Sequence, residues 1–262
     1  MARIVEFTSL GGPEVLNIVD RDPTPPNPGE VQIAVKAAGL NRAELLFMAG
    51  QYLVDPKLPS GLGFEGAGEV LALGEGVRRS SPGDRVAITP AFTQNAYGIL
   101  GEIINVPETA LEALPTETSW SGGAAFWMAY GTAYGLLVQT GGLSEGAGQY
   151  VVLNAASSSV GTAAFQIIRA HGGTSIAATL TAEKVDGLKA AGADHVIVTD
   201  QEDLVARVMD ITDGHGFDIA LDAVQGGAGE TLANAAGFEA TMVAYGLLSG
   251  TPSATPFYPM VS

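Results

Sequence analysis

The stretch Val151-Val-Leu-Asn-Ala-Ala-Ser-Ser-Ser-Val-Gly161 decides the fold of the second half of the chain. A short apolar strand runs into a turn of small residues, and an apolar helix follows. A dinucleotide-binding turn needs small residues, because its backbone turns tightly, approaches the pyrophosphate closely and presents helix N-terminal N–H groups to it. Only one glycine of the glycine-rich fingerprint is present, so the turn alone also fits an ordinary strand–helix connection. The candidate cofactor-binding residues are Ala156, Ser157, Ser158, Ser159, Val160 and Gly161.

Strands and helices alternate along the chain after this turn. Such alternation is typical of successive βαβ units, which form a parallel sheet with helices on both faces. The position of the turn at the head of five such units favours a nucleotide site over an ordinary connection. We expect strands at Tyr150–Asn154, Ser175–Thr179, His195–Val198, Asp218–Asp222 and Thr241–Tyr245. We expect helices at Val160–His171, Ala182–Ala191, Glu202–Thr212 and Gly229–Ala236.

The first half of the chain is rich in short strands separated by Gly and Pro turns, which is typical of a compact barrel-like domain. One helix is expected at Asn41–Ala49, with Asn41 as its N-cap and Gly50 at its end, and a second, Ala-rich helix at Ser121–Leu137. The predicted domains are therefore residues 1–124 and 125–262. The expected strands are Arg3–Phe7, Val15–Val19, Val31–Gly39, Gly66–Leu73, Arg85–Ile88 and Gly101–Val106.

Composition excludes several classes of function. The 28 Asp and Glu outnumber the 12 Lys and Arg, a formal net charge of −16, which argues against binding to nucleic acid or to an anionic membrane surface. The absence of Cys excludes disulfides, thiolate zinc sites and Cys nucleophiles. The N-terminus has no signal-peptide pattern, and the apolar runs are too short to span a bilayer. We expect a soluble, cytoplasmic protein.

The residues at the end of the second strand of the parallel sheet indicate which nicotinamide cofactor binds. NAD sites usually carry an acidic residue there for the ribose 2′-hydroxyl, whereas this chain has Thr179 and then Lys184. With no carboxylate at the strand end to repel a 2′-phosphate, we expect NADPH rather than NADH. Lys184 equally fits a solvated helix residue.

A series of short motifs makes the chain resemble the medium-chain dehydrogenase/reductases, in particular their zinc-independent quinone oxidoreductase-like branch. The resemblance covers essentially the whole chain and implies a GroES-like β-barrel domain followed by a Rossmann-like doubly wound parallel sheet. The motifs are Ala38-Gly-Leu-Asn-Arg-Ala-Glu44 with Gly50-Gln-Tyr52, Gly61-Leu-Gly-Phe-Glu-Gly-Ala-Gly68, Pro82-Gly-Asp-Arg-Val86, Tyr130-Gly-Thr-Ala-Tyr134, Asn154–Gly161, Gly192-Ala-Asp-His195 and Asp218-Ile-Ala-Leu-Asp222.

The resemblance implies hydride transfer from NADPH to a quinone or to the β-carbon of an α,β-unsaturated carbonyl compound. By resemblance, Asn41 and Tyr52 line the nicotinamide pocket, with Tyr52 as the donor to the developing enolate oxygen. Thr132 would contact the nicotinamide end, and Gly246 would leave room for the cofactor. Asn41 also fits a helix N-cap only, and Tyr52 a tyrosine on the barrel surface.

No metal site is expected. Zinc-dependent members of the family use Cys and His ligands, but the position of a ligand His reads Gly63-Phe-Glu65 here. Glu65 fits a structural hydrogen bond or ion pair better. His171, His195 and His215 are scattered over the cofactor half and do not form a ligand set.

Three features depart from the family pattern. Gln225 stands where relatives usually have glycine, and Leu180 stands where close relatives often have arginine. Five strands are expected where the family has six, since the sixth needs roughly 30 residues more. We therefore expect an exposed sheet edge at Thr241–Tyr245, and a homodimer stays open because the family's dimer strand is absent. Two alternatives remain: a truncated cofactor-binding protein with little catalysis, and a zinc alcohol dehydrogenase, which the absence of Cys disfavours.

Overall fold

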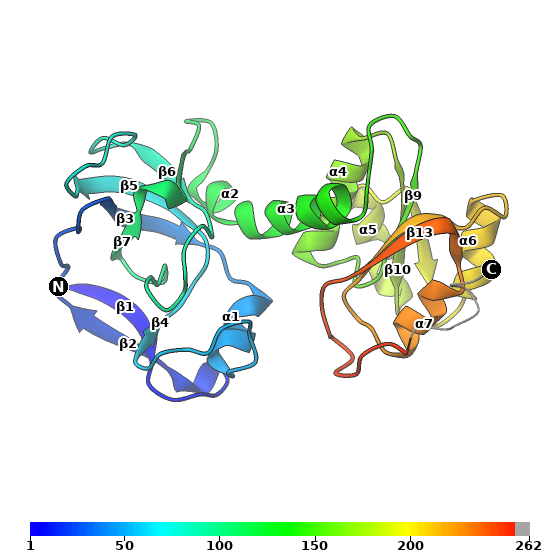
Figure 1. Cartoon of the computed structure of the whole chain (residues 1–262), viewed down its shortest axis with the longest axis horizontal. Coiled ribbons are helices and arrows are strands. Elements are labelled where there is room, and N and C mark those ends of the chain that lie inside the picture. Colours follow the sequence, from blue (N-terminus) through cyan, green and yellow to red (C-terminus); the bar gives the residue numbers. More distant parts are fainter. Residues whose placement is uncertain (255–262) are drawn as a thin grey trace. The chain divides into compact units, whose positions relative to one another are not determined.

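A computed structural model describes residues 1–254 (Figure 1). The chain forms two compact units, the first of residues 1–128 and the second beginning at Ala129. The first unit is built mainly of antiparallel strands, and the second is a parallel sheet with helices. None of the helices within residues 1–254 has the length and apolar character that a bilayer span requires.

The first unit contains two antiparallel sheets. A three-stranded sheet has the order β2-β1-β4, and a five-stranded sheet has the order β7-β3-β5-β6-β8. A bridge between Ile4 and Gly101 joins β1 to the segment before β7. The smaller sheet consists of β1 (Ala2–Phe7), β2 (Leu16–Arg21) and β4 (Ser60–Gly61), and the larger one of β3 (Glu30–Ala38), β5 (Gly66–Leu73), β6 (Arg85–Ile88), β7 (Ile103–Pro107) and β8 (Leu111–Ala113).

Helix α1 (Arg42–Met48) follows β3 in the first unit. Asn41 is its N-cap, as predicted, and Gly50 ends the following turn with a φ of 66°, a value that suits glycine. Phe47 and Met48 are fully buried against Phe7, so the helix is anchored on the smaller sheet. Asn41 is thereby fixed at the start of a packed helix.

The prediction of one helix over Ser121–Leu137 is wrong. The segment forms α2 (Trp120–Ala124), α3 (Trp127–Tyr134) and a π-helical stretch, Gly135–Thr140. The paired glycines of α2 have low helix propensity, and the Glu65 carboxylate accepts a hydrogen bond from the N–H of Met128 at 2.9 Å. This side chain satisfies an N–H group in the first turn of α3, so a new helix can begin there.

The second unit is a five-stranded parallel sheet, as predicted, with the order β11-β10-β9-β12-β13. The doubly wound α/β class expected from the sequence is confirmed. Its strands are β9 (Tyr150–Leu153), β10 (Thr174–Thr179), β11 (His195–Val198), β12 (Phe217–Asp222) and β13 (Ala236–Ala244). Its helices are α4 (Ser159–Ala170), α5 (Val185–Ala191), α6 (Leu204–Ile211) and α7 (Gly227–Ala233), with a 3₁₀ turn at Ala182–Lys184.

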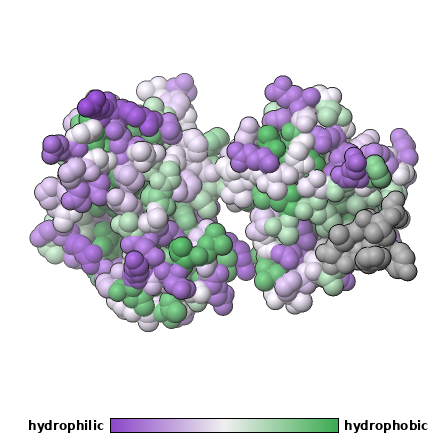
Figure 2. All heavy atoms as spheres, in the orientation of Figure 1, coloured by the Kyte–Doolittle hydropathy of each residue, from purple (hydrophilic) through white to green (hydrophobic). Residues whose placement is uncertain are grey.

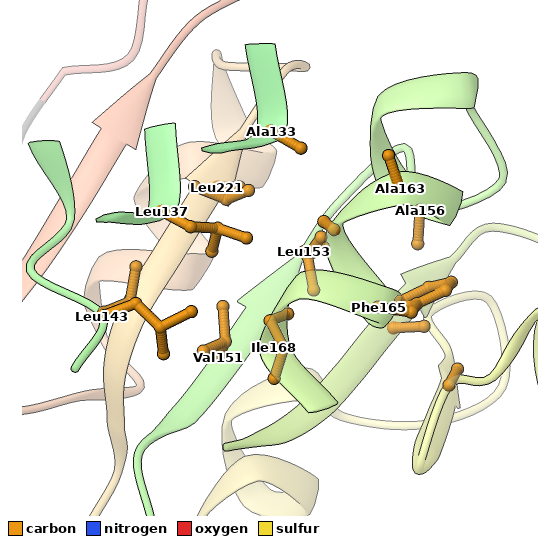
Figure 3. Close-up of a cluster of buried hydrophobic side chains, with 14 of the residues drawn as sticks. Ala133, Leu137, Leu143, Val151, Leu153, Ala156, Ala163, Phe165, Ile168 and Leu221 are labelled. Carbon is orange, nitrogen blue, oxygen red and sulfur yellow. The ribbon is translucent and has the colours of Figure 1, made fainter. Parts of the chain in front are cut away.

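The two faces of this sheet carry separate cores, because successive side chains of a strand point to opposite faces. On β9, Val151 and Leu153 pack with Phe165 and Ile168 of α4, as Figure 3 shows. Val152 points the other way, into a core that α6 and α7 help to form. Continuous apolar strands of this kind are typical of parallel sheets buried on both faces.

The last strand differs from the prediction. β13 begins at Ala236, where the sequence predicts the end of a helix, because Ala236 pairs with Phe217 of β12. The register then shifts before Thr241, and Glu239 takes a left-handed φ of 57°. This bulge interrupts the alternation that would have revealed a nine-residue strand. Within residues 1–254, β13 pairs only with β12 and lies at the edge of the sheet.

A pair of Gly→Ala substitutions tests the packing of the turn after β9. A Cβ at Gly161 would lie 2.2 Å from the carbonyl oxygen of Ala156, whereas one at Gly187 in α5 would meet nothing within 4 Å. We expect Gly161→Ala to lower the free energy of unfolding by about 1–3 kcal/mol. Gly187→Ala should raise it by about 0.5–1 kcal/mol. Chemical denaturation measures both, and equal effects of the two substitutions would contradict the close approach at Gly161.

Candidate functional site

The second unit contains a cavity of about 610 Å³ at the carboxyl ends of its parallel strands. Its walls come from the turn after β9, the end of β10, the segment between β11 and α6, and the start of α7. The strand order changes direction between β9 and β12. Ligands of open parallel sheets bind outside the carboxyl ends of the strands at such a point.

The turn between β9 and α4 is compact. Ala155 takes a left-handed φ of 47°, and Ser158 is the N-cap of α4, its hydroxyl accepting a hydrogen bond from the N–H of Gly161 at 3.1 Å. Gly161 permits the contact with Ala156 described above. The Gly161 N–H is used by this cap, whereas the N–H groups of Ser159 and Val160 in the first turn of the twelve-residue α4 have no partner among the described residues and can bind an anion.

The predicted cofactor residues of this turn divide into two groups. Ala156 and Ser157 line the cavity. Ser158 caps α4, and Ser159, Val160 and Gly161 form its first turn. The Ser158 oxygen accepts the cap hydrogen bond, and its O–H group can still donate, as expected from the sequence.

A buried network joins the ends of β9 and β12. The Asn154 amide donates to Asp222 Oδ1 at 2.6 Å, and its oxygen accepts from the N–H of Ala223 at 2.8 Å. Asp222 Oδ1 also accepts from the N–H groups of Val224 and Gln225, at 3.0 and 2.7 Å. These bonds fix both strand ends at the mouth of the cavity.

Gln225 and Gly246 lie next to this network. Gln225 takes a left-handed φ of 59°, a conformation that favours glycine, and its amide donates to the carbonyl oxygen of Gly246. A Cβ at Gly246 would lie 2.7 Å from the carbonyl oxygen of Ala223. Gly246 is therefore required by close backbone packing, and neither residue lines the cavity.

The end of β10 supplies Thr179, Leu180 and Lys184 to the cavity wall. Lys184 is exposed, and among the described residues that line this cavity it is the only one with a cationic side chain. Leu180 is 65% exposed although it is apolar.

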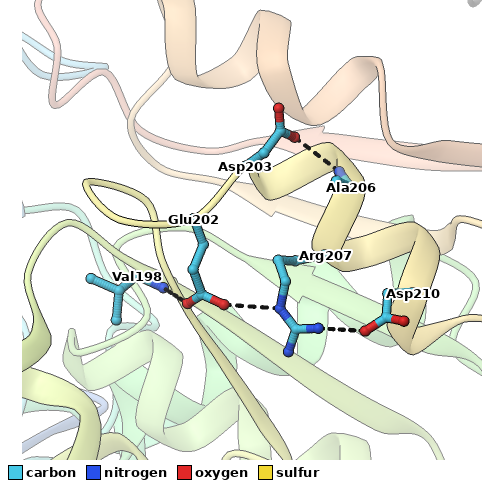
Figure 4. Close-up of polar contacts among 6 residues, drawn as sticks. All are labelled: Val198, Glu202, Asp203, Ala206, Arg207 and Asp210. Carbon is cyan, nitrogen blue, oxygen red and sulfur yellow. Dashed lines mark hydrogen bonds and ion pairs between the residues drawn. The ribbon is translucent and has the colours of Figure 1, made fainter.

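Two acidic residues also line the cavity, Glu202 and Asp203. Both carboxylates are engaged (Figure 4): Glu202 accepts from the N–H of Val198 and from Arg207 Nε, each at 2.9 Å, and Asp203 accepts from the N–H of Ala206 at 2.9 Å. The hydrogen bond from Val198, helped by the Arg207 charge, lowers the pKa of Glu202. These residues were missed from the sequence because they follow the third strand of the sheet, not the second.

A second polar cluster lies in the first unit, around the start of α1. Asn41 links two buried carboxyl groups: its backbone N–H donates to Glu44 Oε2 at 2.6 Å, and its amide donates to Glu65 Oε1 at 3.0 Å. The bond to Glu44 is one half of a capping box. The expectation that Glu65 makes a structural hydrogen bond is confirmed.

Glu44 is only 3% exposed, and its second oxygen, Oε1, has no hydrogen-bond partner among the described residues. Burial raises the pKa of Glu44 to about 7, and the charge of Glu65 adds to the increase. Tyr52, half-buried, packs edge-on against Phe64 with a ring-centroid distance of 5.6 Å. Burial and the Glu44 charge raise the pKa of Tyr52, so the phenol stays protonated at neutral pH.

The remaining candidate, Thr132, is half-buried in α3 and does not line the cavity. The structure thus brings Asn41 and Tyr52 into one region of the first unit, and Ala156, Ser157, Thr179 and Lys184 into one cavity of the second.

Comparison with known proteins places the whole chain in one family. Residues 27–156 match the family described as alcohol dehydrogenase GroES-like domain, and residues 159–262 match the one described as zinc-binding dehydrogenase. The chain is 34% identical over 250 residues to the quinone oxidoreductase of Pseudomonas aeruginosa, covering 95% of this chain and 75% of that protein. Quinone oxidoreductase 1 of Escherichia coli is also 34% identical, with coverage of 95% and 74%.

The chain belongs to the quinone oxidoreductase-like medium-chain dehydrogenase/reductases. This family consists of NAD(P)H-dependent oxidoreductases, and the predicted GroES-like and Rossmann-like architecture is confirmed with it. The quinone oxidoreductase structure from Pseudomonas syringae pv. tomato DC3000 has a TM-score of 0.88 at 35% identity, covering 99% of this chain and 78% of that one. The E. coli quinone oxidoreductase structure, which is a complex with NADPH, has a TM-score of 0.85 at 31% identity, covering 100% and 77%.

This quinone oxidoreductase-like protein has no grouping of three or more His, Asp or Glu side chains placed to hold a metal ion within residues 1–254. Both carboxylate oxygens of Glu65 accept hydrogen bonds, one from the Asn41 amide and one from the Met128 N–H.

The pKa of Glu44 predicts a pH dependence of stability. Because this carboxyl ionises near pH 4.3 when unfolded and near 7 when folded, its contribution to stability is fully present below about pH 4 and is lost as pH rises to about 7. We expect the melting temperature of the protein, relative to that of Glu44→Gln, to fall between about pH 4 and pH 7. The amide retains an acceptor for the Asn41 N–H. Parallel melting curves of the two proteins at all pH values would show that Glu44 ionises normally.

Proposed function

We propose that the protein is an NADPH-dependent reductase that transfers hydride to a quinone or an α,β-unsaturated carbonyl compound, without a metal. The observation that carries the proposal is the cavity at the carboxyl ends of β9, β10 and β12, with a helix N-terminus at one wall and Lys184 at another. The relatives named quinone oxidoreductase, one of them solved with NADPH, support the choice of substrate and cofactor.

The residues of the second unit fit a dinucleotide. The small residues Ala156 and Ser157 and the first turn of α4, Ser159–Gly161, would hold the pyrophosphate. Thr179 and Lys184 would hold the 2′-phosphate, since the acidic residues of the cavity are already hydrogen-bonded. We assign Thr132 to the nicotinamide end and Gly246 to the close packing beside it. When bound, NADPH supplies the hydride.

The residues of the first unit would serve the substrate. The Tyr52 phenol is protonated at neutral pH and makes no hydrogen bond within its own unit, so it can donate to a carbonyl or quinone oxygen. Asn41 is held by the two carboxyl groups and would orient the reacting groups.

An apolar surface around Tyr52 suits a substrate of this kind. Figure 2 shows hydrophobic atoms over the part of the first unit that holds α1. The exposed apolar side chains of this part of the chain include Leu40 and Leu53, which directly precede Asn41 and follow Tyr52, with exposed fractions of 79% and 90%. An uncharged quinone or enone loses less hydration free energy on such a surface than an ionised substrate would.

A fluorescence titration of the purified protein with NADPH and NADH tests the proposal, followed by addition of a quinone or an α,β-unsaturated ketone. We expect tighter binding of NADPH and its oxidation on addition of one of these substrates. Binding without oxidation would favour a cofactor-binding protein with little catalysis. Failure to bind either nucleotide would refute the proposal.

Replacing Lys184 tests the assignment of the 2′-phosphate. A charge-assisted hydrogen bond contributes about 1.5–3 kcal/mol, so Lys184→Ala should weaken NADPH binding by about 10-fold or more and leave NADH binding unchanged. Lys189→Ala is the matched control, because Lys189 lies in α5 and does not line the cavity. Equal effects of Lys184→Ala on the two nucleotides would exclude this role.

Introducing an arginine at position 180 tests the same assignment through a gain, rather than a loss, of preference for NADPH. Leu180 lines the cavity with an exposed side chain, so an arginine there can reach solvent and a bound phosphate. We expect Leu180→Arg to increase the ratio of NADPH to NADH affinity by about 10-fold, measured by the same titration. An unchanged ratio would place the 2′-phosphate elsewhere.

A further inference from the structure

The walls of the cavity in the second unit carry charges of both signs. Among the described residues that line it, Glu202 and Asp203 are acidic and Lys184 is basic. A sphere of this cavity's volume is about 10 Å across, close to the Debye length of about 8 Å at physiological ionic strength, so a charge on one wall acts on a ligand at another. The two carboxylates would therefore oppose a bound 2′-phosphate unless other groups offset them.

The charge of Asp203 is offset by the helix that this residue caps. Asp203 is the N-cap of the eight-residue α6, and its Oδ1 accepts a hydrogen bond from the N–H of Ala206 at 2.9 Å. The partial positive charge at the start of a helix stabilises a carboxylate in this position. Glu202 precedes the cap and accepts no hydrogen bond from the N–H groups of α6, so its charge needs a different partner.

Arg207 of α6 is the partner of Glu202. Glu202 Oε1 accepts from the N–H of Val198 and Oε2 accepts from Arg207 Nε, each at 2.9 Å (Figure 4). The Nη1 group of Arg207 pairs with Asp210, so two contacts fix the guanidinium group. Both oxygens of Glu202 are thus engaged, and one of them is held by a cation that does not itself line the cavity.

The sheet connects Glu202 with the end of β10. Val198, which donates to Glu202, is the register partner of Thr179 in the neighbouring strand, and adjacent strands lie about 4.8 Å apart. The N–H of Thr199 also donates to the carbonyl oxygen of Thr179 at 2.8 Å. Glu202 is therefore anchored one strand away from a residue assigned to the 2′-phosphate.

Loss of Arg207 would leave Glu202 Oε2 without its partner on the cavity wall. A free carboxylate oxygen repels a phosphate, and it can accept a hydrogen bond from a ribose hydroxyl, as acidic residues do in NAD sites. The Arg207 and Glu202 side chains are 38% and 32% exposed, and ion pairs at the surface contribute little to stability. The contact consequently matters more for the charge of the cavity than for the fold.

We propose that Arg207 is a positioning residue for cofactor selection: it holds the Glu202 carboxylate and offsets its charge, and so permits the 2′-phosphate of NADPH to bind. This inference rests on the proposed function, in which Thr179 and Lys184 hold that phosphate. It extends the function by naming a residue outside the cavity on which the preference for NADPH depends.

The first test compares two nucleotides that differ only in the 2′-phosphate. Calorimetric titration of the protein with adenosine 2′,5′-bisphosphate and with adenosine 5′-monophosphate measures the contribution of this phosphate without hydride transfer. We expect Arg207→Gln to lower the ratio of the two affinities about 3- to 10-fold, through weaker binding of the bisphosphate. Arg169→Gln is the matched control, because Arg169 is an exposed residue of α4 that does not line the cavity, and its loss changes the net charge equally. Equal decreases in the two variants would overturn the inference.

A double-mutant cycle shows whether Arg207 acts through Glu202. Glu202→Gln removes the charge and keeps an acceptor for the Val198 N–H, so it should raise the affinity ratio, and adding Arg207→Gln to it should cause little further change. Effects that multiply independently would mean that Arg207 acts by its own charge alone, and would overturn the positioning role. Arg207→Lys retains the charge and should retain most of the ratio. If Arg207→Gln does not fold, an unchanged ratio in Glu202→Gln would overturn the inference.

Titration with NADPH and NADH separates this inference from the proposed function. If the unsubstituted protein binds neither nucleotide, the proposed function is overturned, and this inference with it. If it prefers NADPH and Arg207→Gln shows the same preference, the inference alone is overturned and the reductase function stands. We expect a preference for NADPH that Arg207→Gln reduces and Arg169→Gln leaves unchanged.

Discussion

The hydrogen bond between Asn154 and Asp222 is the contact on which the second unit most depends. It ties the carboxyl ends of β9 and β12 at the point where the strand order changes direction, and the same side chains also hold the backbone of Ala223, Val224 and Gln225. A parallel sheet diverges at such a point, and the divergence makes room for a ligand. Because Asn154 and Asp222 Oδ1 bond to each other and to the backbone after β12, the ends of both strands are tied together by the protein's own groups.

The first unit also depends on buried side-chain hydrogen bonds, which here hold the starts of α1 and α3. Two carboxyl groups, Glu44 and Glu65, are buried beside one asparagine and are not paired with a cation among the described residues. Glu65 has a structural role, because it accepts hydrogen bonds from the Asn41 amide and from the Met128 N–H at the beginning of α3. Glu44 keeps one carboxylate oxygen, Oε1, without a hydrogen-bond partner among the described residues.

The sequence predicted the parallel sheet well, because its five apolar strands and their turns obey simple local rules. It failed where a distant contact overrides local preference: Glu65 starts α3 in the middle of an expected helix, and pairing with Phe217 turns Ala236 from helix to strand. For the candidate site, the sequence indicates only those residues that the spacing of the strands reveals. The β9 turn and Lys184 are readable from spacing, whereas Glu202 and Asp203 reach the cavity from another crossover, and the isolation of Glu44 Oε1 depends on three-dimensional packing.

The most direct test of the account is a single turnover of the NADPH-loaded protein with a quinone, using NADPH that carries deuterium in the transferred position at C4. Direct hydride transfer from cofactor bound in the second unit predicts oxidation of NADPH within one turnover, and slower oxidation of the deuterated form. Bound NADPH that persists after quinone is added would contradict the central claim and leave a cofactor-binding protein.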